Sequence, residues 1–166
     1  MTKKIIPLLL FSFMLLVATN VYSAGLFGAK VAEQASDPTL GQMLTYAIQD
    51  EYLAHAEYEF IIGKYGSIRP FSNIIRAEET HIDMLKPLFE KYGFQVPENT
   101  AKEHIVVPKD LKGAFETGVQ AEIDNIGMYE KLLEKSLPDD VKSVFQRLRD
   151  ASGNHLRAFK NGLSRY

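Results

Sequence analysis

The stretch Arg76-Ala77-Glu78-Glu79-Thr80-His81 lies in the middle of a long helical pattern. Glu78 and His81 are three residues apart, so they project from the same face of a helix. That face also carries apolar or aromatic residues at steps of three and four, namely Phe71, Ile74, Leu85, Leu88 and Tyr92. This spacing predicts the buried seam of a helical bundle. Because an unpaired buried carboxylate is costly, the pattern indicates that something compensates it, and a metal ion is the simplest candidate.

Apolar periodicity predicts four helices, over 38–65, 71–92, 108–137 and 139–164. The turns around Gly66 and Pro138 are short, which is typical of antiparallel neighbours, whereas the second and third helices are joined by a long connection. Residues 105–107 are expected to cross the bundle as extended chain. The predicted fold is all-α, an antiparallel four-helix bundle with a long crossover between its second and third helices.

Each of the other three predicted helices has one acid or imidazole at the centre of its apolar seam. These residues are Glu51, Glu122 and His155. With Glu78 and His81 they make three carboxylates and two imidazoles from four helices, and counting from the turns places them within a turn or two of one height. Such a donor set suits iron, manganese or zinc. The alternative is a layer of hydrogen-bonded polar residues without metal.

Further seam residues are candidates to surround this site. Tyr58 and Tyr129 lie two turns along the seams from Glu51 and Glu122, where they could donate hydrogen bonds or serve as ordinary bundle aromatics. Asn125 is also on a seam. Glu57 falls off the seams, so we expect it on the solvated face.

The same motifs resemble the ferritin-like superfamily, whose di-iron members use one Glu from each of two helices and Glu-x-x-His from the other two. The resemblance covers about 38–159. It maps the single glutamates onto Glu51 and Glu122, and the paired motif onto Glu78 and His81. The fourth helix matches only at its histidine, His155. The resemblance implies a ferritin-like fold with iron as the expected metal, one or two ions per chain, and with manganese or zinc as alternatives.

More closely, several short runs resemble a bacterial exported ferritin-like family catalogued only as a domain of unknown function. The runs are Asp50-Glu51-Tyr52, the segment 69–75, Glu122-Ile123-Asp124-Asn125 and the segment 154–159. One residue departs from the ferritin-like pattern. Ser152 stands three residues before His155, where that pattern needs a bridging Glu. Ser152 is therefore expected beside the metal, and a mononuclear or asymmetric site is one interpretation.

The N-terminus has the organisation of a targeting segment. Lys3 and Lys4 precede an apolar run over 5–18, and small residues follow near Ser23 and Ala24. We expect a signal peptide over 1–24 that is cut near Ser23 or Ala24, a flexible lead-in over 25–36 and the bundle over 37–166. The expected location is the periplasm, with no stable membrane span after the signal is removed. An uncleaved anchor is the alternative.

Composition excludes several classes of protein. The chain has 166 residues, a formal net charge of −2 and no basic patch, which argues against nucleic-acid binding. It has no cysteine, so thiolate metal sites and disulfides are excluded. The leading hypothesis is an iron-dependent oxidoreductase that acts on oxygen or peroxide, as ferroxidases and peroxidases do. The alternatives are a non-catalytic metal-binding protein of the cell envelope and a purely structural bundle. A homodimer is left open.

Overall fold

The computed structural model describes residues 26–166, so the expected signal peptide lies outside the described residues. Within this range every regular element is a helix. The elements are α1 (Ala29–Gln34), α2 (Leu40–Tyr65), α3 (Phe71–Lys91), the 3-10 helix η1 (Ala101–Glu103), α4 (Leu111–Leu133) and α5 (Asp139–Leu163). None of the described helices is both long and apolar enough to cross a membrane. The prediction of an all-α protein is confirmed.

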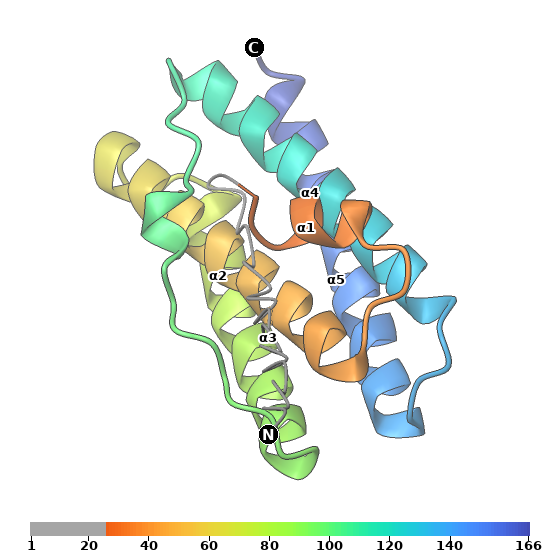
Figure 1. Ribbon diagram of the computed structural model, residues 1–166. Coiled ribbons are helices and arrows are strands. Elements are labelled where there is room, and N and C mark those ends of the chain that lie inside the picture. Colours follow the sequence, from red (N-terminus) through yellow and green to blue (C-terminus); the bar gives the residue numbers. More distant parts are fainter. Residues whose placement is uncertain (1–25) are drawn as a thin grey trace, which may run out of the picture.

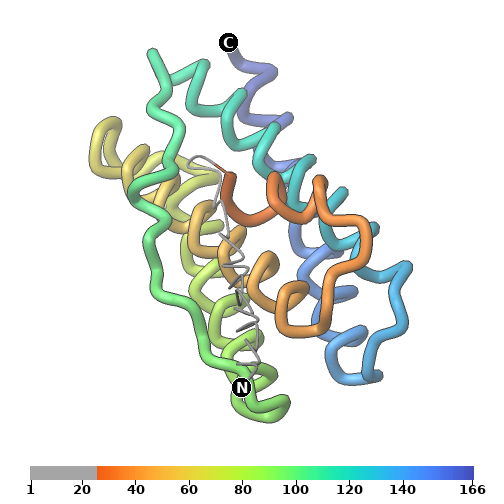
Figure 2. The backbone as a smooth tube through the Cα atoms, in the orientation of Figure 1, coloured from red at the N-terminus to blue at the C-terminus, as the bar shows by residue number. Residues whose placement is uncertain are grey.

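The long helices pack as two pairs, α2 with α3 and α4 with α5. The chain turns back over 66–70 and again over 134–138, so the two helices of each pair run in opposite directions (Figure 1). The link between α3 and α4 runs along the bundle from one end to the other, and its η1 packs against α2 (Figure 2). These helix pairs confirm a helical bundle and position the predicted seams face to face.

Side-chain caps set where two of the long helices begin. The Thr39 hydroxyl accepts a hydrogen bond from the Gln42 backbone N–H, and the Gln42 side chain accepts one from the Thr39 N–H. This capping box starts α2 two residues later than the periodicity predicts. The Asp110 carboxylate accepts from the Gly113 N–H at 2.8 Å, which starts α4 at 111 rather than 108. That helix also ends at 133, four residues before the predicted end and ahead of Pro138.

The core consists of two apolar clusters. One is centred on residues such as Leu85, Phe89 and Phe145, and the other contains a group of aromatic side chains that includes Phe71 and Phe159. On α3, α4 and α5, the predicted polar seam residues fall between the two clusters along the helix. The apolar ends therefore hold the bundle together, while the middle layer is left to acids and imidazoles.

The segment 26–36 makes up most of the stretch 25–36 that we expected as a flexible lead-in. It contains α1, which lies across α2 and α4 (Figure 1). Phe27, Ala29 and Ala32 are buried, so this segment contributes to the core. The Lys131 ammonium group donates to the backbone carbonyls of Ala32 at 2.9 Å and Glu33 at 2.7 Å. A cation at these last-turn carbonyls stabilises the C-terminal end of so short a helix.

The prediction that Glu57 faces solvent is wrong. Glu57 is only 4% exposed, because the crossover lies against α2 at this point. The Val106 backbone N–H donates to Glu57 Oε1 at 3.0 Å. Burial raises the pKa of Glu57, and this hydrogen bond partly offsets the rise. Residues 105–107, predicted to cross the bundle as extended chain, lie in the crossover and have no regular secondary structure.

Candidate metal centre

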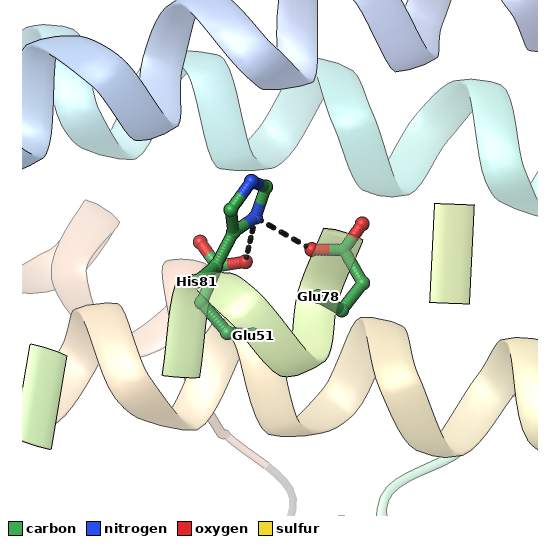
Figure 3. A group of neighbouring side chains, drawn as sticks. All are labelled: Glu51, Glu78 and His81. Atoms are coloured by element: carbon green, nitrogen blue, oxygen red, sulfur yellow. Dashed lines mark hydrogen bonds and ion pairs between the residues drawn. The ribbon is translucent and has the colours of Figure 1, made fainter. Parts of the chain in front are cut away.

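Two of the predicted carboxylates and one imidazole form a first cluster between α2 and α3. It comprises Glu51, Glu78 and His81, which point toward one another in Figure 3. His81 Nδ1 lies 3.0 Å from Glu51 Oε2 and 2.9 Å from Glu78 Oε2. The three residues are 1%, 2% and 6% exposed. This first cluster is therefore a closed, water-poor arrangement of one nitrogen and two carboxylate donors.

A second cluster brings the other two predicted residues to the same glutamate. It comprises Glu78, Glu122 and His155, from α3, α4 and α5. His155 Nδ1 lies 3.2 Å from Glu78 Oε1 and 3.5 Å from Glu122 Oε1. Both Glu78 Oε1 and His155 Nδ1 are buried, yet within 26–166 neither makes a hydrogen bond of acceptable geometry. The two atoms form an ion pair that lacks a well-aligned hydrogen bond, so both are open to a further partner such as a metal ion.

Glu78 joins the two clusters, because one of its oxygens faces His81 and the other faces His155. The two imidazole rings are 5.6 Å apart between centroids, at an angle of 23°. In each cluster one donor atom from every residue lies within 4.8 Å of the others. Ligands about 2.0–2.2 Å from one ion lie up to about 4.4 Å apart, so small side-chain movements are enough to form either coordination shell.

The five side chains predicted as ligands are thus brought together from four helices. Their assignment as metal ligands remains a prediction, but the residues present fit a metal ion. The donors are carboxylates and imidazoles of the kind that iron, manganese and zinc accept, and the unpartnered Glu78 and His155 atoms are where an added cation would be stabilised.

The two predicted tyrosines each hold one of the outer glutamates. The Tyr58 hydroxyl donates to Glu122 Oε1 at 2.7 Å, and the Tyr129 hydroxyl donates to Glu51 Oε1 at 2.6 Å. Burial raises the pKa of both hydroxyls well above the ordinary value, and the nearby carboxylates add to the rise. Both tyrosines are therefore neutral donors that orient the outer glutamates. Tyr129 holds Glu51 Oε1 and leaves Oε2 to His81, whereas Tyr58 holds Glu122 Oε1, the same oxygen that faces His155.

Ser152 and Asn125 form a polar pair beside the first cluster. The Ser152 hydroxyl donates to Asn125 Oδ1 at 2.6 Å, and it also lies 3.1 Å from the Leu148 carbonyl oxygen. The Asn125 amide donates to Asp50 Oδ2 at 2.9 Å and lies 3.3 Å from Glu51 Oε1. This pair connects α5, α4 and α2 at the place where the ferritin-like pattern has its fourth carboxylate.

Asp50 is a buried member of this layer that the sequence did not single out. Its Oδ1 accepts from the Ala29 backbone N–H at 2.8 Å, so it connects α1 to the polar layer. Burial raises the pKa of Asp50 to about 8, although the hydrogen bonds from Ala29 and Asn125 oppose the rise. The sequence feature that could have pointed to Asp50 is its position next to Glu51, one residue from the seam of α2. Its burial follows from α1, which the sequence did not predict.

The charges of the two clusters depend on one another. Burial alone would lower the pKa of His81, but the Glu51 and Glu78 carboxylates outweigh it and raise that pKa to about 10. For His155, burial again acts downward, and Glu122 and Glu78 raise the pKa to about 9. Burial raises the pKa of Glu51, whereas for Glu78 the two histidines overcome burial and lower it. Without metal, both imidazoles are therefore cations that partly neutralise the carboxylates.

Together, the fold and the site define an all-helical protein with buried Glu/His clusters that could form a metal site. Residues 41–165 match the family described as an uncharacterized protein domain, DUF2202, and the chain belongs to this family. A curated relative, the uncharacterized protein MJ0754 of Methanocaldococcus jannaschii, is 32% identical over 135 residues, a match that covers 71% of each chain. The expected membership in a family of unknown function is confirmed.

A solved structure shows the same relationship in three dimensions. The chain is similar to the crystal structure of hypothetical protein MJ0754 from Methanococcus jannaschii DSM 2661, with a TM-score of 0.67 and 28% identity. The match covers 80% of this chain and 87% of that one. The printed descriptions of this family and this relative state no activity, so the function has to be argued from the site.

Proposed function

We propose that this protein is an exported ferritin-like metal-binding protein with an iron site that acts on oxygen or peroxide. The observation that carries the proposal is the pair of clusters that share Glu78, in the second of which the buried Glu78 Oε1 and His155 Nδ1 atoms make no well-aligned hydrogen bond. A carboxylate with one oxygen toward each cluster is the arrangement that a bridging ligand of two metal ions requires. Two antiparallel helix pairs joined by a long link support the ferritin-like topology.

The charges of the layer support divalent ions. Three glutamates bring −3, and two divalent ions would bring +4, so the remaining charge would be closed by hydroxide or another small anion. One divalent ion would leave −1. When metal binds, it replaces the two protons that the histidines carry in the metal-free protein, so the layer exchanges one set of positive charges for another.

Bound iron would supply the one-electron steps that reduce oxygen or peroxide. The side chains of this chain have simpler roles. Glu51 and His81 would hold one ion and Glu122 and His155 the other, with Glu78 between them. The two tyrosine hydroxyls orient the outer glutamates, and the apolar clusters above and below exclude bulk water. No cysteine is available for an electron-transfer centre in the chain, so electrons would come from free ferrous iron or from a partner.

A non-catalytic metal-binding protein is the second candidate, and one observation favours it. Ser152 and Asn125 occupy the place of the fourth carboxylate and are already hydrogen-bonded to each other. With one carboxylate fewer, the site has less negative charge to stabilise an oxidised metal. This candidate needs the same five ligands and predicts metal binding without turnover.

Metal stoichiometry tests the proposal. The purified protein would be loaded with Fe(II) without oxygen, desalted and analysed for metal per chain. Glu78→Gln removes the shared ligand at constant side-chain size, and Glu79→Gln is the matched control, because Glu79 is the exposed neighbour. We expect up to two ions per chain in the wild type and the control, and a loss of both in Glu78→Gln.

Oxygen consumption then separates the two candidates. Consumption in proportion to the added iron, absent in Glu78→Gln, supports the oxidoreductase. Stable metal binding without consumption of oxygen or peroxide supports the second candidate. A folded wild-type protein that retains no iron, manganese or zinc would show that the polar layer is structural.

A further inference from the structure

A cavity of about 310 Å³ lies beside the second cluster. Its walls come from α1, α2, α4 and the crossover, and its lining includes Tyr58, Glu78 and Glu122. Phe27 and His104, whose rings stack at 4.4 Å, contribute to the wall from the segment just before α1 and from the crossover. The cavity therefore connects the polar layer to the face of the bundle that α1 partly covers (Figure 1).

The cavity is lined by acids far more than by bases. Its basic side chains are Lys30 and His104, whereas six acids contribute to the lining, namely Asp50, Glu57, Glu78, Glu116, Glu122 and Asp124. Of these, Asp50 is mostly uncharged at pH 7, because burial raises its pKa to about 8. The acids lie at different depths. Glu116 is exposed and Asp124 is half-buried. Glu57, Glu122 and Glu78 are buried, at 4%, 3% and 2% exposed. A cleft of one charge sign concentrates ions of the opposite sign.

The cavity reaches the two clusters unequally. Glu78 and Glu122 of the second cluster line it, but Glu51 and His81 of the first cluster do not. The Glu78 oxygen without a hydrogen-bond partner, Oε1, is the one that belongs to the second cluster. A neighbouring cavity of about 240 Å³ is lined by two lysines and two acids, Lys30, Lys131, Glu33 and Asp124, and by no residue of either cluster.

We propose that this acidic cavity is the entry site for a hydrated divalent cation, which exchanges at the second cluster while the first cluster retains its ion. The inference rests on the proposed metal site and adds the route and the order of loading. A water molecule occupies about 30 Å³ of the liquid, so the cavity has room for an ion with a shell of about six waters. Glu57 and Asp124 attract the ion on the way in, and Glu78 and Glu122 replace its waters at the end.

Zinc uptake tests the route without redox chemistry. The purified metal-free protein would take Zn²⁺ from a weakly binding fluorescent dye in a stopped-flow instrument. The double variant Glu57→Gln, Asp124→Asn removes two cavity charges, and Glu59→Gln, Asp83→Asn is the matched control, because it removes two charges outside the cavity. We expect the cavity variant to load about tenfold more slowly, with a weaker salt dependence and unchanged final stoichiometry.

A second variant blocks the space itself. Ala121→Phe places a ring at the cavity wall and should slow uptake further, again with unchanged stoichiometry. If it does not fold, the charge variant alone decides, because its substitutions keep side-chain size. Exchange of bound zinc for a separate zinc isotope should show one fast and one slow ion per chain, and the charge variant should slow only the fast one.

The outcomes separate the inference from the metal site on which it rests. A wild-type protein that takes up no metal refutes both. Normal uptake in the wild type, with the same rate in the cavity variant and in its control, refutes the route and leaves the metal site intact. Two ions that exchange at one rate refute the order of loading.

Discussion

Metal binding should release two protons per chain at pH 7, one from each cluster. The carboxylates raise the pKa of His81 to about 10 and that of His155 to about 9, so both imidazoles are cations at neutral pH in the metal-free protein. An imidazole binds a metal ion only in its neutral form. Each ion that enters must therefore displace one proton from its histidine.

The pKa values give the size of the effect. At pH 7 about 0.1% of His81 and about 1% of His155 would be neutral, which follows from shifts of three and two units from that pH. At about 1.36 kcal/mol per unit, proton competition costs about 4 kcal/mol at the first cluster and about 3 kcal/mol at the second. Each apparent affinity should therefore rise about tenfold per pH unit between pH 6.5 and 8.5.

Isothermal titration calorimetry with Zn²⁺ measures this directly, because repeating the titration in buffers with different heats of ionisation counts the protons released. His81→Asn should reduce the count by one. His104→Asn should leave it at two, because this histidine lies outside both clusters. Binding of two ions without proton release, or affinities independent of pH, would refute the reasoning, since the histidines would then be neutral beforehand or would not be ligands.

Three further outcomes can be measured. Ser152→Glu should restore the missing carboxylate and raise metal occupancy, and elemental analysis that finds no change would contradict it. Gly162→Ala should destabilise the fold by about 1–3 kcal/mol in urea unfolding, because the new methyl group overlaps the Phe115 ring. Gly63→Ala should stabilise the fold by about 0.5–1 kcal/mol, because its new methyl group has no atom within 4 Å and alanine favours a helix over glycine. In the metal-free protein the folded-state pKa values of both site histidines lie above the ordinary 6.5, so their stabilisation is complete below that pH and is lost as the pH rises toward 9–10. The melting temperature should fall across this range, and a constant value would show that the ion pairs do not form.

Helical periodicity was enough to bring the five polar seam residues together. A helix repeats every 3.6 residues, so Glu78 and His81 had to share a face with Phe71 and Leu85. The bundle then had to bury that face, and the acids with it. Periodicity also placed Tyr58 correctly among these residues, where its hydroxyl meets a carboxylate.

Periodicity could not predict the contacts made by α1 and by the crossover, because neither segment shows a helical repeat. α1 has only six residues, too few to show an amphipathic repeat, and Lys131, almost 100 positions away, caps its carbonyls. The burial of Asp50 depends on α1, and the burial of Glu57 depends on the crossover. From the sequence alone Glu57 is expected to face solvent, because it lies off the seam of α2, and Asp50 is marked only by its position next to Glu51. Both belong to the wall of the acidic cavity.

In the proposed ferritin-like site, Ser152 stands where a bridging glutamate is expected, and its hydrogen bonds have a structural consequence of their own. The Ser152 hydroxyl donates to Asn125, and the Asn125 amide donates to Glu51. This side of the polar layer is therefore closed by hydrogen bonds within the protein. Within residues 26–166 each cluster offers three candidate ligands, so in the proposed site a bound ion would take its further ligands from outside this set. The cavity reaches Glu122 but not Glu51, so an outside ligand meets the second cluster first. If both clusters bind metal as proposed, their two ions are expected to differ in access, and an experiment that averages the two ions would miss this difference.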